Sequence, residues 1–126
     1  MEFVRTGIII KTENYEECTH FYSDILGLPI NYEQADAEED FRMTYFEFGS
    51  SYLLVETGGK ANPQGKDVDE NPTVLRFDVA DALQILENLK AKGVSAQFHK
   101  FLWGWLVIVL DPDGNQIEFK QDPPTQ

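Results

Sequence analysis

Two glutamates occupy matching places in two apolar segments, and their surroundings are the first sign of a site. Glu56 ends the run YLLVE, and Glu118 lies within GNQIEFK. Because side chains alternate along a strand, each carboxylate points away from its apolar neighbours, and Arg76 of TVLRFDV is predicted to share that face. Such a face could bind a ligand, use Glu56 or Glu118 as a general base, or hold internal ion pairs. Internal pairing is the interpretation we prefer for Arg76, since a buried carboxylate without a partner is costly.

Aromatic side chains and one histidine complete the candidate ligand-binding set, which comprises Tyr45, Tyr52, His99, Trp103 and Trp105. Trp103 and Trp105 flank a single glycine, so alternation predicts that both lie on one side of a strand. They would form a flat surface for a planar or cationic ligand, or pack equally well at a dimer interface. His99 is predicted to face the same side as the glutamates, as a polar wall residue in preference to a proton-transfer group.

The remaining reactive side chains have simpler interpretations. His20 precedes a helical apolar position and is predicted to be a surface residue, whereas Cys18 is predicted to be a small buried hydrophobe. The polar residues that alternate with apolar ones are also typical of a sheet with one face in water. A site therefore requires two such sheets to curve around a shared cavity.

Composition limits the class of protein. The chain has 126 residues, 42% of them hydrophobic, which predicts a single domain spanning 1–126. A net charge of -12 argues against nucleic acid and favours solubility or, less directly, attraction of a cationic small molecule. No apolar run approaches the ~20 residues of a membrane span, the first residues do not resemble a secretory signal, and one cysteine suits a reducing compartment. We therefore expect a cytoplasmic protein without a membrane partner.

The elements that position these residues repeat once along the chain. Residues 1–57 and 73–120 each read as strand, helix and three further strands, and residues 58–72 read as a linker. Asn14 and Asp81 are the predicted helix caps, and Gly27 and Gly93 the predicted stops. Asp111-Pro112-Asp113-Gly114 is the predicted turn of the last hairpin. The fold class is α+β: two βαβββ modules forming a curved mixed sheet around a cavity.

Several stretches resemble the vicinal oxygen chelate superfamily, which includes glyoxalase I, extradiol dioxygenases, and fosfomycin and bleomycin resistance proteins. They are HFYSDILGL at 20–28, FEFG and YLLVE within 46–56, WG at 103–104, and DPDGNQIEF at 111–119. The resemblance implies paired βαβββ modules around a U-shaped cavity, commonly completed in a homodimer. It also implies metal ligands on the first and last strands of each module, at about Gly7, Glu56, Val74 and Glu118.

Two of those four positions carry no donor atom, since glycine and valine cannot bind a metal through their side chains. Catalytic divalent metals generally need three or more protein ligands, so we expect no metal and no cofactor. The predicted function is that of a metal-free, bleomycin-resistance-like protein, which binds or sequesters a small, cationic or aromatic organic molecule. The alternatives are a lyase or isomerase acting on a small carbonyl compound, with Glu56 or Glu118 as general base, and a non-catalytic structural or regulatory dimer.

Overall fold

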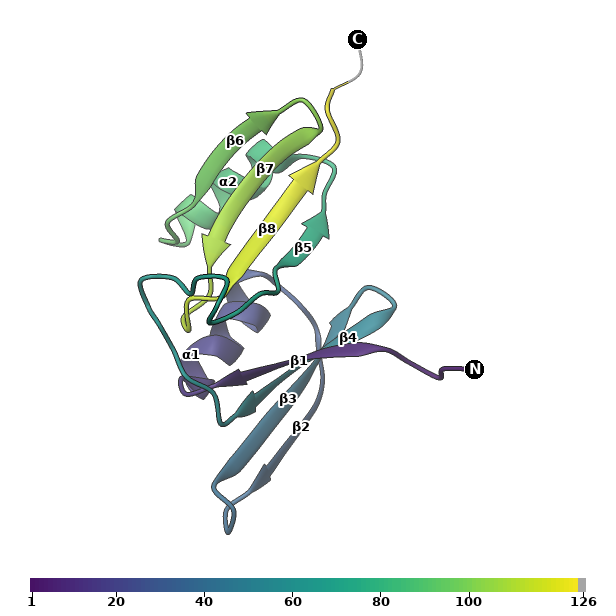
Figure 1. Cartoon of the computed structure of the whole chain (residues 1–126), viewed down its shortest axis with the longest axis vertical. Coiled ribbons are helices and arrows are strands. Elements are labelled where there is room, and N and C mark those ends of the chain that lie inside the picture. Colours follow the sequence, from purple (N-terminus) through teal and green to yellow (C-terminus); the bar gives the residue numbers. More distant parts are fainter. Residues whose placement is uncertain (125–126) are drawn as a thin grey trace. The chain divides into compact units, whose positions relative to one another are not determined.

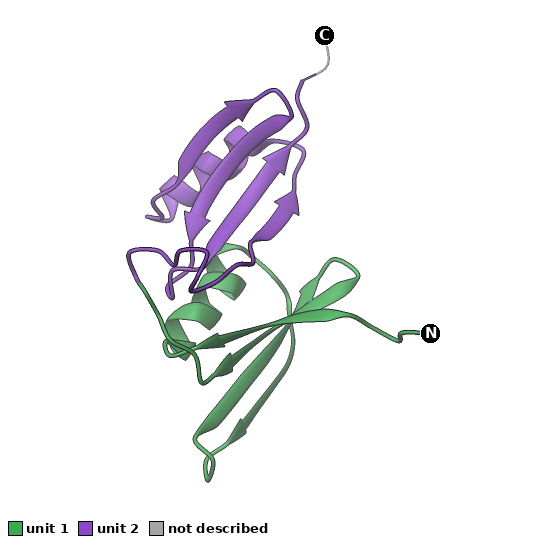
Figure 2. Ribbon diagram, viewed as in Figure 1, with its two compact units in different colours: residues 1–62 green, residues 63–126 purple. Residues whose placement is uncertain are grey.

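The computed structural model describes residues 1–124, which form two compact units (Figure 2). The first unit is Met1–Asn62, and the second begins at Pro63. Each contains one four-stranded sheet, of order β1-β4-β3-β2 in the first and β5-β8-β7-β6 in the second (Figure 1). In both sheets the first and last strands of the unit pair in parallel, and the other pairings are antiparallel. The predicted α+β class and the repeated βαβββ plan are confirmed.

The elements of the first unit follow the predicted order, with one irregularity in the helix. Residues 21–25 form a π-helical turn that continues α1, and Leu26 donates its N–H to the carbonyl of Phe21 at 2.9 Å. The elements are β1 (Gly7–Thr12), α1 (Tyr15–His20), η1 (Phe21–Ile25), β2 (Ile30–Asp36), β3 (Phe41–Phe48) and β4 (Ser51–Thr57).

The second unit has a longer, regular helix, which lies behind its sheet in Figure 1. Its elements are β5 (Leu75–Asp78), α2 (Ala82–Ala91), β6 (Gln97–Phe101), β7 (Gly104–Leu110) and β8 (Gln116–Gln121). The last hairpin turns where predicted. The carboxylate of Asp111 accepts the N–H groups of Asp113 and Asn115 at 3.0 and 2.8 Å, and Gly114 has a φ of 89°.

The cores confirm which sheet faces the helices cover. In the first unit the buried side chains of β3 and β4 pack with Cys18 and Tyr22 of the helix; in the second, those of β7 and β8 pack with Leu89 of α2. The sheet residues concerned are Thr44, Phe46, Leu53, Val55, Val107, Val109, Ile117 and Phe119. We call the opposite side of each sheet its helix-free face. Glu56 and Glu118 alternate with these core residues, so both carboxylates lie on the helix-free faces, as predicted.

The two helix starts differ from each other. Asp81 accepts the N–H of Gln84 at 3.1 Å and caps α2, as predicted, whereas within residues 1–124 no hydrogen bond of the Asn14 side chain caps α1. Both predicted stops are confirmed, since Gly27 and Gly93 have φ values of 77° and 79°. No helix within residues 1–124 is long and apolar enough to cross a membrane.

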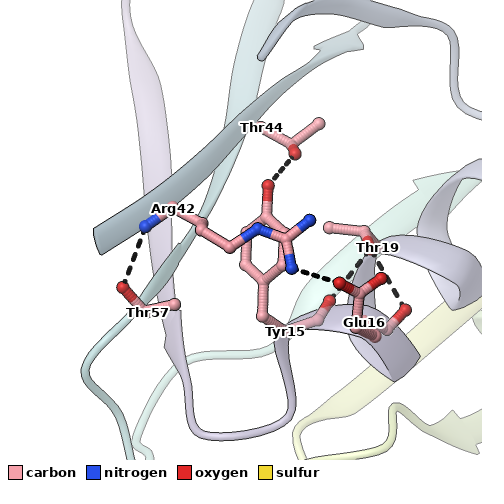
Figure 3. Close-up of polar contacts among 6 residues, drawn as sticks. All are labelled: Tyr15, Glu16, Thr19, Arg42, Thr44 and Thr57. Atoms are coloured by element: carbon pink, nitrogen blue, oxygen red, sulfur yellow. Dashed lines mark hydrogen bonds and ion pairs between the residues drawn. The ribbon is translucent and has the colours of Figure 1, made fainter. Parts of the chain in front are cut away.

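A polar cluster attaches α1 to β3 (Figure 3). Arg42 lies over the ring of Tyr15, 4.4 Å from its centroid, and forms an ion pair with Glu16. The Tyr15 hydroxyl reaches the buried Thr44 hydroxyl, and Arg42 also donates its backbone N–H to Thr57 Oγ1 at 3.2 Å. The hydrogen bond with Glu16 raises the pKa of Arg42, so this guanidinium stays charged at any ordinary pH.

Candidate functional site

In the first unit, Glu56 is neutralised by a lysine of the neighbouring strand. Lys11 on β1 is the register partner of Glu56 on β4, and its Nζ donates to Glu56 Oε1 at 2.6 Å. The glutamate side chain is 11% exposed and the lysine side chain 61% exposed. Among residues 1–124 no donor reaches the second oxygen of Glu56. The carboxylate is therefore paired on one oxygen and open on the other.

In the second unit, the equivalent carboxylate is held more completely. Arg76 on β5 is the register partner of Glu118 on β8, and its Nε and Nη2 both donate to Glu118 Oε1, at 3.0 and 2.8 Å. Gln116 Nε2 donates to the other oxygen at 2.8 Å. The glutamate is again 11% exposed at its side chain. Both oxygens of Glu118 thus have partners, as expected from the need to compensate a carboxylate that leaves water.

The two pairs are equivalent positions of one repeated unit. Each joins the first strand of a unit to its last strand, across the single parallel pairing of that sheet. The sequence prediction of internal pairing for Arg76 is confirmed. Lys11 was not among the predicted site residues, although alternation from Ile9 places it on the helix-free face.

The ring of Tyr52 fills the space that a side chain at Gly7 would occupy. A Cβ added at Gly7 would lie 2.3 Å from the Cε1 and Cζ atoms of that ring, far inside van der Waals contact. Tyr52 is the register partner of Gly7 on β4. The first of the metal-ligand positions implied by the family resemblance is therefore covered by an aromatic ring, and a larger residue there would displace it.

The donor set of neither unit suits a divalent metal. In the first unit, Gly7 and Glu56 are four residues apart in register, roughly 13 Å along the strands at ~3.3 Å per residue. In the second, Glu118 is opposite Arg76, and Val74 precedes β5. Each glutamate has an ammonium or guanidinium group where a cation would bind. Within the described chain, no three His, Cys, Asp or Glu side chains are grouped closely enough to hold a metal ion.

Three tyrosines gather on the helix-free face of the first unit. Tyr45 of β3 lies between Tyr32 and Tyr52, with ring centroids 6.1 and 5.2 Å away. The guanidinium carbon of Arg5 lies 4.9 Å from the centroid of the Tyr52 ring. With Asn31, these four residues line a pocket of about 360 Å³. The structure thus brings together the predicted Tyr45 and Tyr52 and adds Arg5 and Tyr32.

The aromatic residues of the second unit are divided between the two faces of its sheet. Trp105 is opposite Lys100 and packs against Phe98, on the face that α2 covers. Trp103 lies in the turn after β6 and stacks on Phe101 at 4.9 Å. The prediction that both tryptophans lie on one side is wrong, because the turn at residues 102–103 interrupts the alternation of a single strand.

A row of stacked groups follows the helix-free face instead. The ring centroids of His99 and Phe101 are 5.8 Å apart, and Phe101 in turn stacks on Trp103. The guanidinium carbon of Arg76 lies 5.5 Å from the centroid of the Trp103 ring. His99 therefore faces the same side as Glu118, as predicted. The phenylalanine was missed, although its spacing of two residues from His99 signals a shared face.

Two other predictions from the residue pattern are confirmed. His20 is an exposed residue that contacts Asp24 at 2.7 Å, and Cys18 is fully buried.

A pocket of about 550 Å³, which the sequence did not predict, opens at one end of β6, β7 and β8 and is lined mainly by apolar residues. Its lining includes Val94, Ile108, Leu110, Pro112, Gln97 and Gln116.

Solved structures share this fold at low sequence identity. A glyoxalase family protein from Enterococcus faecalis is 19% identical, with a TM-score of 0.69 over 94% of this chain and 96% of that one. A fosfomycin resistance protein, FosX, from Listeria monocytogenes, complexed with Mn(II) and sulfate, is 15% identical, with a TM-score of 0.75 over 98% and 95%. The trypanothione-dependent glyoxalase I of Leishmania major is 17% identical, with a TM-score of 0.75 over 95% and 87%.

A search of curated proteins gave no match. The sequence model for the Glyoxalase/Bleomycin resistance protein/Dioxygenase superfamily matches residues 6–119, which is most of the chain. The repeated βαβββ unit and the likeness to glyoxalase and fosfomycin resistance structures agree with that match. This chain therefore belongs to the Glyoxalase/Bleomycin resistance protein/Dioxygenase superfamily.

Proposed function

We propose that this protein binds a small organic molecule without a metal ion, on the helix-free faces of its sheets. The observation that carries the proposal is the pairing of Glu56 with Lys11 and of Glu118 with Arg76. In both units a basic side chain takes the place that a cation would need beside the carboxylate. Sequestration of a ligand, as in the bleomycin resistance branch of the superfamily, requires a shaped and partly apolar surface but no such ion.

The same pairs change the expected ligand. Glu56 and Glu118 are compensated by internal cations, so they give little support for a preference for cationic ligands. The contacts left for a ligand are the tyrosines of the first unit and the His99, Phe101 and Trp103 row of the second. Both are π surfaces, which favour a planar aromatic molecule.

Elemental analysis of the purified protein tests the proposal, before and after incubation with Mn²⁺, Ni²⁺, Zn²⁺ and Fe²⁺. We expect no stoichiometric metal in any sample, and aromatic probes should bind equally well before and after treatment with EDTA. A stoichiometric metal, or ligand binding that EDTA abolishes, would refute metal-free binding. Sedimentation velocity on the same samples tests the homodimer that we expect from the family.

A second function deserves a test because Glu56 keeps one oxygen open. That oxygen could accept a proton from a small carbonyl substrate, whereas both oxygens of Glu118 are engaged. If the protein is a lyase or isomerase, Glu56→Gln abolishes turnover while the protein stays folded. Equal turnover by wild type and Glu56→Gln would remove Glu56 as the base and favour simple binding.

A further inference from the structure

The pocket of the first unit combines an aromatic wall with one arginine, Arg5, that has no acidic partner among residues 1–124. Its volume of about 360 Å³ is within the usual range of ~300–1,000 Å³ for small-molecule sites. The tyrosines come from three adjacent strands, β2, β3 and β4, so the sheet itself spaces their rings. Tyr45 and Tyr52 are half-buried, whereas Tyr32 is exposed at the rim. Rings held in this way present their faces without much further loss of side-chain freedom.

Arg5, which precedes β1, differs from the cations on this unit's sheet. Lys11 is paired with Glu56 and Arg42 with Glu16, but within residues 1–124 Arg5 forms no ion pair and contacts the face of the Tyr52 ring. This is notable in a chain of net charge -12. Glu47 on β3 faces the same way and is the register partner of Tyr52, yet within the described part of the chain no ion pair joins it to Arg5. The planar guanidinium keeps its N–H edge available while its face rests on the ring.

We propose that this pocket binds a planar aromatic molecule that carries a carboxylate. The ligand ring packs against Tyr32 and Tyr45, and its carboxylate receives two parallel hydrogen bonds from Arg5. Asn31 supplies an amide at the same pocket. A cationic ligand is disfavoured here, because it would face an uncompensated guanidinium. This inference rests on the proposed function and adds to it the chemical class of the ligand.

Titration with 2-naphthoate tests the proposal, using the full chain in ~0.15 M salt, where the Debye length of ~8 Å screens the overall negative charge. The comparison ligands are 2-naphthamide, which has the same rings without the charge, and 2-naphthyltrimethylammonium, which reverses it. We expect saturable binding of one 2-naphthoate per chain and binding of both comparison ligands weaker by about tenfold or more. Amide chemical shifts should change mainly at residues of the first unit.

Arg5→Gln is the decisive variant, since Arg5 precedes β1 and its loss should not disturb the fold. We expect this variant to lower the affinity for 2-naphthoate by about tenfold. The affinity for 2-naphthamide should stay unchanged, because only the carboxylate uses the guanidinium. Tyr45→Leu should lower the affinity for both ligands. Arg42→Gln is the matched control: Arg42 also lies over a tyrosine, but it is paired with Glu16 and lies on the opposite face of the sheet. It should leave both affinities within about twofold of wild type, since it makes no contact with the pocket.

The inference would be overturned by the absence of saturable 2-naphthoate binding or by an affinity that Arg5→Gln does not change. It would also be overturned by a dimer that Arg5→Gln dissociates, which would make the pocket an interface between copies. If the cationic or neutral probe binds instead, without metal, the carboxylate inference fails and the proposed function stands. A stoichiometric metal that 2-naphthoate binding requires would refute the proposed function itself.

Discussion

The two units use one register position in two different ways. In the first, a largely exposed lysine contacts one oxygen of Glu56; in the second, Arg76 and Gln116 together satisfy both oxygens of Glu118. The backbone pairing is the same, so the difference comes from side-chain chemistry alone. A compact ammonium leaves part of a carboxylate open, whereas a guanidinium with an amide encloses it. Repetition of a fold therefore need not repeat the properties of its site.

The neighbourhoods of these pairs diverge further. The first unit presents a tyrosine pocket beside Gly7 and an arginine that pairs with no carboxylate of the described residues. In the second unit the arginine is already committed to Glu118 and to the face of Trp103, which leaves a stacked row open to solvent. The first unit is thus the better candidate for recognising a charged ligand, and the second for stacking.

The largest effect should come from removing the cation of the second pair. Arg76→Met leaves Glu118 nearly buried with only Gln116 as a partner, and should lower the free energy of unfolding by about 1.5–3 kcal/mol. Arg76 is itself 45% exposed, so the loss should stay below that of a fully buried pair. Lys11→Met should lower it by only about 0–1 kcal/mol, because the lysine is largely exposed. Urea unfolding measures both, and equal losses would contradict the contrast between the units.

The family resemblance assigns a metal ligand to the first strand of each unit, at Gly7 and at Val74. A histidine should destabilise the fold at Gly7 but not at Val74. Gly7→His forces the Tyr52 ring away from Tyr45 and Arg5, and should lower the free energy of unfolding by about 1–3 kcal/mol. Val74→His should change it by less than about 0.5 kcal/mol, since Val74 is 44% exposed. The double variant Gly7→His/Tyr52→Ala controls for the clash. If Gly7→His is as stable as wild type, the ring does not limit this position.

The last contrast concerns the helix starts. Asp81→Ala removes the capping bond to Gln84 and should lower the free energy of unfolding by ~1 kcal/mol. Asp81→Asn keeps an acceptor oxygen and should cost only a few tenths of that loss. Thermal unfolding followed by circular dichroism distinguishes the two. Equal losses in both variants would assign the effect to the negative charge at the helix end and not to the hydrogen bond.

Much of the local structure follows from short-range rules that the sequence alone supplies. Alternation placed Glu56, Glu118 and His99 on the helix-free faces, and the glycines at 27 and 93 ended the helices. These features depend on a residue and its nearest neighbours, because strand periodicity and positive φ are local properties of the backbone. The repeat of strand, helix and three strands was predictable for the same reason.

The site needed the tertiary structure. Lys11 meets Glu56 only because β1 and β4, which α1, η1, β2 and β3 separate in sequence, pair in one parallel register. The same register places the Tyr52 ring over Gly7, and the turn at residues 102–103 sends Trp103 and Trp105 to different faces. Such contacts depend on the register between distant strands and on the path of a turn. The sequence therefore determined which side chains could reach a site, and the packing of distant strands decided which of them meet.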